Sequence, residues 1–188
     1  MQDELRSRLE LAGMAVGNLP DELESQLITA GNQLSRSLLA EKKIIALGLG
    51  DGRAMAKYFV DELIHSSQLD RPPLPCLLIS DNPGGEILAR ELSALATHED
   101  TLVLFQNSRN IPLSGNKDKK LSVLYEAINS INLPVILVGH SFNYHLENSN
   151  FIALTLDNES RMNYLCSGVA VSLTLAALID HQLFGHSV

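Results

Sequence analysis

Five short apolar segments, separated by helical patterns or polar loops, constrain the fold of this chain more than any other feature. They are continuous apolar runs rather than alternating patterns, at residues 43–47, 76–80, 101–105, 134–138 and 151–156. Strands of this kind are buried on both faces, as in parallel sheets that helices cover on each side. The sequence therefore predicts an α/β fold with a doubly wound, parallel five-stranded sheet.

Helical patterns occupy both ends of the chain. Residues 1–40 predict two helices separated by Asn18-Leu19-Pro20, the second with one apolar stripe from Leu23 to Leu38. So regular a stripe must pack on the domain or on another subunit, and we interpret residues 1–40 as a helical oligomerisation segment. The last predicted helix, 160–183, is apolar nearly all round, so we expect it to be buried centrally or shared between subunits.

The remaining segments complete one predicted domain. Its 188 residues are enough for a continuous core, and we place the α/β core at residues 41–188. Three shorter helices are expected, at residues 53–65, 86–96 and 121–131. The polar segments 106–118 and 139–150 are expected to be loops.

Composition excludes several classes of function. The formal net charge is −8 and no dense run of Lys and Arg occurs, which disfavours direct binding to nucleic acid. The mixed charges of residues 1–13 do not form a signal peptide, and the longest apolar stretch, 169–179, is short for a membrane span. Cys76 and Cys166 lie in apolar segments, as expected for buried packing residues in a reducing cytoplasm.

A turn with alternating glycines follows the first apolar run. Residues 48–53 read GLGDGR, and glycines between a strand and a helix typically let backbone N–H groups approach a phosphate. The turn also carries Asp51. At an effective dielectric constant of about 20, two unit charges about 5 Å apart repel by roughly 3 kcal/mol. We therefore favour Asp51 as the N-cap of its own helix over a ligand contact, although Arg53 could offset part of its charge.

Beyond single features, the chain resembles the sugar isomerase (SIS) domain family. The resemblance rests on the strand–glycine turn–helix unit that ends in Phe59-Val60-Asp61-Glu62-Leu63, and on Arg71-Pro72-Pro73-Leu74-Pro75 before the next strand. Within the family the chain is similar to the phosphoheptose isomerase group over residues 21–82 and 161–186. That group includes the DnaA initiator-associating protein, a non-catalytic relative. The resemblance implies a SIS-type fold with two N-terminal helices and a long C-terminal helix.

The resemblance also allows the catalytic residues to be tested one by one. Phosphoheptose isomerases interconvert a ketose phosphate and an aldose phosphate, which requires a general base and a general acid. Glu62 matches the family's glutamate base, but Val171 stands at its acid/base histidine, Tyr58 at its metal-associated histidine and Asn163 at its glutamine. Loss of one acid/base group typically forfeits about 10²- to 10⁴-fold in rate. We therefore favour a non-catalytic protein.

Candidate residues for binding an anion follow from the same resemblance, and candidate metal ligands can be judged from their neighbours in the sequence. The resemblance implies ligand contacts in two loops, where the family's hydroxyl position has become Gly52 and at most one hydroxyl of the second loop remains. The candidate ligand-binding residues are Gly50, Asp51, Gly52, Arg53, Asn107, Ser108 and Arg109. His140 and His145 have no cysteine or carboxylate cluster beside them, so we expect neither a metal nor a cofactor.

Two functions remain open. The first is an oligomeric scaffold or regulator, a homodimer or homotetramer, in which Leu183 and Phe184 match the pair that contacts DnaA in the initiator-associating relative. This pair either tucks back onto the domain or forms an exposed anchor, and Gly185 is expected to end the helix. The second is a phosphosugar-binding protein or an isomerase-like enzyme, with a substrate of the sedoheptulose 7-phosphate type.

Overall fold

The computed structural model describes residues 13, 17, 21–67, 69–79, 85–107, 116–140, 151–156 and 160–185. The first predicted helix lies almost entirely outside the described residues. The elements that follow alternate along the chain: α2 (Asp21–Leu39), β1 (Ile44–Leu49), α3 (Gly52–His65), β2 (Cys76–Ile79), α4 (Gly85–Leu95), β3 (Thr101–Asn107), α5 (Asn116–Ile131), β4 (Val135–His140), β5 (Phe151–Thr155) and α6 (Arg161–Phe184).

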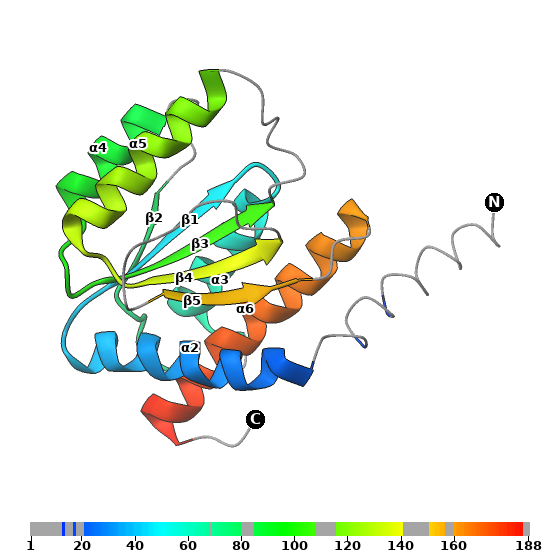
Figure 1. The fold of residues 1–188 in the computed structure, drawn as a ribbon. Helices are drawn as coiled ribbons and strands as arrows, with labels where there is room; N and C mark the ends of the chain where they lie inside the picture. The colour runs from blue at the N-terminus through cyan, green and yellow to red at the C-terminus, as the bar shows by residue number, and fades with distance from the viewer. Residues whose placement is uncertain are drawn as a thin grey trace.

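The five strands form one parallel sheet in the order β2-β1-β3-β4-β5 (Figure 1). The helices divide into two layers. Helices α2, α3 and α6 contribute to a core on one face, whereas α4 and α5 contribute to a core on the other. The predicted doubly wound α/β fold is confirmed.

Two strands, β3 and β4, end later than predicted because polar residues continue them. We expected loops from residue 106 and from residue 139, but β3 extends to Asn107 and β4 to His140. Pairing explains the difference, because Gln106 is in register with both Leu49 and Gly139. Backbone hydrogen bonds to a parallel neighbour outweigh the turn propensity of polar side chains here.

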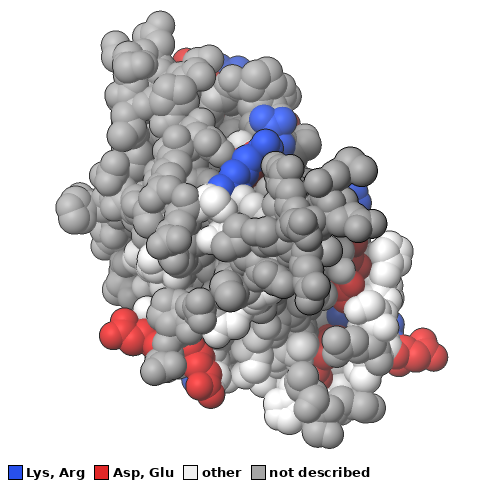
Figure 2. Space-filling view, turned by 90° about the vertical axis from the view of Figure 1, so that its right-hand side faces the viewer, with Lys and Arg blue, Asp and Glu red and all other residues white. Residues whose placement is uncertain are grey.

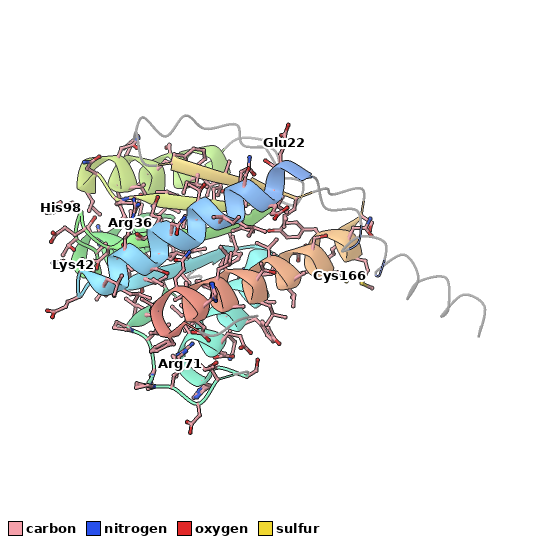
Figure 3. All side chains as sticks on the ribbon, turned by 90° about the horizontal axis from the view of Figure 1, so that it is seen from below. Glu22, Arg36, Lys42, Arg71, His98 and Cys166 are labelled. Atoms are coloured by element: carbon pink, nitrogen blue, oxygen red, sulfur yellow. The ribbon has the colours of Figure 1, made fainter. Side chains whose placement is uncertain are left out.

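Helix α6 buries one stripe of side chains rather than its whole surface. Its buried residues recur at helical spacing: Tyr164, Ser167, Gly168, Val171, Ser172, Leu175, Ala176 and Ile179. The helix is long and apolar enough to cross a membrane, with a mean hydropathy of 1.7 over 18 residues. It packs against α2 and α3, however, as a core helix does (Figure 3).

Close packing between α3 and α6 depends on one glycine. A Cβ atom at Gly168 would lie 1.7 Å from the Sδ atom of Met55. Met55 itself is completely buried in the core between the sheet and α6. With the Met55 side chain in this position, there is no room for a side chain at residue 168.

The predicted packing cysteines are half-buried rather than fully buried. Cys76 packs against the core on the α3 side of the sheet. Burial raises the pKa of its thiol to about 11, despite the opposing charge of Arg71. The Cys76 thiol is therefore protonated at neutral pH, as expected for a packing residue.

Asp100, before β3, is a buried carboxylate held by four hydrogen bonds. Lys43 donates from its backbone nitrogen at 3.0 Å and from Nζ at 2.7 Å, and Thr97 donates from its backbone nitrogen at 2.8 Å and its hydroxyl at 2.9 Å. Burial alone would raise the pKa of Asp100, but the hydrogen bonds from Lys43 and Thr97 outweigh it and hold the pKa below its usual value.

Substituting Gly168→Ala should destabilise the fold, because the new methyl group would overlap Met55. Overpacking of this kind costs roughly 1–3 kcal/mol, measurable as the free energy of unfolding in urea. In a Met55→Ala background the same substitution should cost clearly less. An equal cost in both backgrounds would show that the contact with Met55 is not the cause.

The Asp100 site predicts how stability depends on pH. A carboxyl group with a lowered pKa stabilises the fold above its unfolded-state pKa of about 3.9, and this contribution disappears as the pH falls through the folded-state pKa. The difference in unfolding midpoint between wild type and Asp100→Asn should thus be largest near neutral pH and narrow below about pH 4. The exposed Asp70→Asn variant is the control. A difference that stays constant down to pH 3 would contradict the assignment.

Candidate functional site

The turn after β1 needs glycine at three places for steric reasons. A Cβ atom at Gly52 would lie 2.1 Å from the carbonyl oxygen of Phe105, and one at Gly48 would lie 2.4 Å from the carbonyl oxygen of Gly52. Gly50 has a φ angle of +60°, in the left-handed region that favours glycine. The turn is consequently pressed against β3 and leads directly into the first residue of α3.

This turn lies at a topological switch point of the sheet. Strand β1 pairs with β2 on one side and with β3 on the other. The chain first adds β2 on one side of β1 and then returns to add β3, β4 and β5 on the other side. In open parallel sheets, ligands bind in the crevice beyond the carboxyl ends of the strands at such a point. Helices α3 and α6 both begin at this edge (Figure 1), and in Figure 2, which faces it, Lys and Arg atoms gather above the centre.

Asp51 does not cap its own helix, contrary to our prediction. Its backbone has φ −66° and ψ −19°, which is helical rather than extended, and its side chain makes no capping hydrogen bond. The carboxylate instead pairs with Arg161 of α6: Nε to Oδ2 is 2.9 Å and the second nitrogen to Oδ1 is 2.7 Å. A bidentate bond to a cation stabilises a carboxylate more than a neutral N–H group does, so the Asp51 carboxylate bonds the distant arginine instead of the free N–H groups of α3.

The pair joins the beginnings of two helices that are 110 residues apart in sequence. Its two sides differ in exposure: the Arg161 side chain is 71% exposed, whereas that of Asp51 is 13% exposed. The hydrogen bond and charge of Asp51 raise the pKa of Arg161 above its usual value. A positive group at this edge is therefore held by an internal carboxylate and remains open to solvent.

Tyr164 lies three residues further along α6 and is completely buried. Within the part of the chain that the structure describes, its hydroxyl group has no hydrogen-bond partner. Burial raises the pKa of this hydroxyl, and the charge of Asp51 raises it further. The hydroxyl thus lies within electrostatic reach of the carboxylate in the glycine turn.

Sequence reasoning missed both Arg161 and Tyr164. A usable signal was present: Ser160 precedes the last helix and follows a predicted strand, which places the first turn of that helix at the carboxyl edge of the sheet. Ser160 does cap α6, accepting a hydrogen bond from the backbone nitrogen of Asn163 at 3.1 Å.

Glu62, the retained candidate base, lies away from the glycine turn within this chain. It is ten residues beyond Gly52 on α3, roughly 15 Å along the helix axis. Its Oε2 accepts hydrogen bonds from the backbone nitrogen of Ser67 at 3.1 Å and from the Ser67 hydroxyl at 2.9 Å. Glu62 therefore closes the turn that follows α3.

The other catalytic positions also serve structural contacts. Val171 is 1% exposed and belongs to the core between α6 and the sheet. Asn163 accepts a hydrogen bond from the Ser160 hydroxyl at 2.9 Å through its side-chain oxygen. Tyr58 is 41% exposed on α3. Val171 has no side-chain proton to exchange, so it cannot supply the acid/base group that a histidine would provide.

The second ligand loop is only partly covered by the structure. Asn107 ends β3 and is in register with His140 at the end of β4. Ser108, Arg109 and His145 lie outside the described residues. Among the residues that are described, no group of three potential metal ligands comes together.

Leu183 and Phe184, the C-terminal pair, differ in whether they pack on the domain or are exposed. Leu183 packs against the core, whereas Phe184 is 38% exposed. The guanidinium group of Arg71 lies 5.9 Å from the centre of the Phe184 ring, and the Nε of Arg71 donates to Asp180 at 2.6 Å. Gly185 ends α6 in the left-handed conformation, as predicted.

Comparisons with known proteins agree on one family. A phosphoheptose isomerase of Methylococcus capsulatus is 26% identical over 95% of this chain and 93% of its own length. The structure of a phosphoheptose isomerase from Francisella tularensis superposes with a TM-score of 0.75 at 19% identity, over 96% of this chain and 98% of that one. That of the Neisseria gonorrhoeae phosphoheptose isomerase superposes with 0.76 at 16% identity, over 95% and 98%.

The chain is related to the SIS-domain phosphoheptose isomerases. No protein-family model matches it. The solved isomerases share its fold, and the named relatives support the phosphosugar isomerase family. The likeness extends over nearly the whole chain.

Proposed function

We propose that this protein binds a phosphorylated sugar at the carboxyl edge of its sheet, in the crevice beside the glycine turn. The observation that carries the proposal is the turn itself, pressed against β3 at the switch point with Gly52 at the start of α3. Backbone N–H groups at a helix start favour an anion, and Arg53 adds a positive side chain there. The named relatives, which are phosphoheptose isomerases, support a heptose phosphate as the ligand class.

Binding without efficient turnover fits the residues better than catalysis does. Proton transfer between adjacent sugar carbons needs two groups that can exchange protons near the same ligand. Val171 has no exchangeable side-chain proton, and Glu62 is bonded to Ser67. The proposed role is that of a phosphosugar-binding member of an isomerase family.

Titration calorimetry with sedoheptulose 7-phosphate tests this role. We expect saturable binding by wild type and roughly 10- to 150-fold weaker binding by Arg53→Gln, because a hydrogen bond to a charged group contributes about 1.5–3 kcal/mol. Lys57→Gln removes the same charge one helical turn further on, where Lys57 pairs with Asp61, and should bind like wild type. No heat of binding at millimolar ligand would reject the role. Isomerisation of the sugar phosphate at rates typical of enzymes would contradict our proposal that the protein binds this ligand without efficient turnover.

A second role, as an oligomeric scaffold that binds a protein partner, is supported by the exposed Phe184 ring at the end of α6. Arg71 and Asp180 hold this end of the helix in place. An exposed aromatic residue on a rigid helix end is the kind of anchor that contributes most to interfaces. The replication initiator DnaA remains our candidate partner.

A capture assay with purified DnaA tests the scaffold role. We expect wild type to retain DnaA and Phe184→Ala to lose most of this retention, while the oligomeric state in gel filtration stays the same. Leu39→Ala is the control, since Leu39 is exposed on α2 instead. Absence of capture by wild type would reject DnaA as the partner.

A further inference from the structure

We propose that Asp51 is an internal competitor of the ligand: it occupies Arg161 in the free protein, and a phosphate group displaces it and binds Arg161 and the Tyr164 hydroxyl instead. This inference rests on the proposed phosphosugar-binding function, and it names Arg161 and Tyr164 as ligand residues. Three observations on the described residues carry it.

The first observation is the geometry of the ion pair. Arg161 reaches Asp51 through Nε and one terminal nitrogen, which uses two of the five N–H donors of a guanidinium group. The Arg161 side chain is 71% exposed, so a dissolved anion can approach its remaining donors. A planar guanidinium group binds a phosphate as readily in this bidentate manner as it binds a carboxylate.

The second observation is the buried Tyr164 hydroxyl. It makes no hydrogen bond within the described part of the chain, although the tyrosine is completely buried. Most buried hydroxyl groups in proteins do have a partner, and an exception calls for an explanation. Tyr164 lies three residues after Arg161 on α6, which places both residues on the same side of the helix, and the charge of Asp51 acts on the Tyr164 hydroxyl. A phosphate in the place of the carboxylate would offer three oxygens and could accept from both Arg161 and Tyr164.

The third observation is the charge balance at the two helix starts. Helices α3 and α6 have 14 and 24 residues and both begin at this edge. Their positive ends, together with Arg53 and Arg161, favour an anion. Asp51 satisfies this preference with a single negative charge, while a phosphate carries close to two. The carboxylate therefore lowers the affinity for phosphate without closing the site.

The test is titration calorimetry of two probes, inorganic phosphate and sedoheptulose 7-phosphate, against a set of variants. Asp51→Asn should bind both probes roughly 10-fold more tightly than wild type, because a repelling unit charge within a few ångströms is removed. Asp61→Asn is the matched control, since it makes the same change on α3 where Asp61 pairs with Lys57, and it should bind like wild type.

Two further variants identify the ligand residues. In the Asp51→Asn background, Arg161→Gln should abolish the gain in affinity. Tyr164→Phe should weaken binding several-fold while leaving the unfolding midpoint unchanged or higher, because the hydroxyl bonds to none of the described residues. If the gain in affinity persists in the Arg161→Gln variant, Arg161 is not a ligand residue. If Tyr164→Phe leaves the affinity unchanged, Tyr164 is not a ligand residue.

The outcomes separate this inference from the proposed function. Equal affinity of wild type and Asp51→Asn, or weaker binding by Asp51→Asn, would overturn competition while the phosphosugar role stands. Binding by Asp51→Asn with none by wild type would support competition and reject phosphosugar binding as the role of the natural protein. Absence of binding by every variant would overturn both.

Discussion

The close approach of the glycine turn to β3 is the constraint on which the candidate site depends. Gly52 can start α3 only because it has no side chain next to the carbonyl oxygen of Phe105. This contact sets where α3 leaves the sheet and directs the start of the helix towards the switch point. A second glycine, Gly168, then lets α6 pack against α3 at Met55. The glycine turn thus fixes the start of α3, and the packing of α6 against α3 leaves no room for a side chain at residue 168.

Once the two helices are placed, the charges at their starts determine what the edge can bind. Asp51 would be a repelling charge for a phosphate if it stood alone. Its bond to Arg161 turns it into half of a neutral pair, and the arginine keeps an exposed face. The acidic turn is therefore compatible with the phosphosugar binding and with the displacement of Asp51 that we propose.

Much of the fold could be predicted because parallel strands and amphipathic helices leave a local pattern. The strand–glycine turn–helix unit and the buried stripe of α2 were recognisable from residue spacing alone. The site was harder to predict. We assigned Asp51 to the cap of α3 because its charge would repel a phosphate in the turn, but its carboxylate pairs with an arginine 110 residues away in sequence. Arg161 and Tyr164 were missed because a first helical turn contains polar residues for many reasons, and spacing does not show what faces them.

The sequence by itself determined the order of helices and strands along the chain and the place of the glycine turn, since both depend on residue type and local periodicity. The tertiary structure decided the order of the strands within the sheet, the pairing of Asp51 with Arg161 and the separation of Glu62 from the turn. These depend on which ends of distant elements meet at one edge of the sheet. Packing between helices and strands decides which ends lie together, and the spacing of residues within a single helix or strand does not show it.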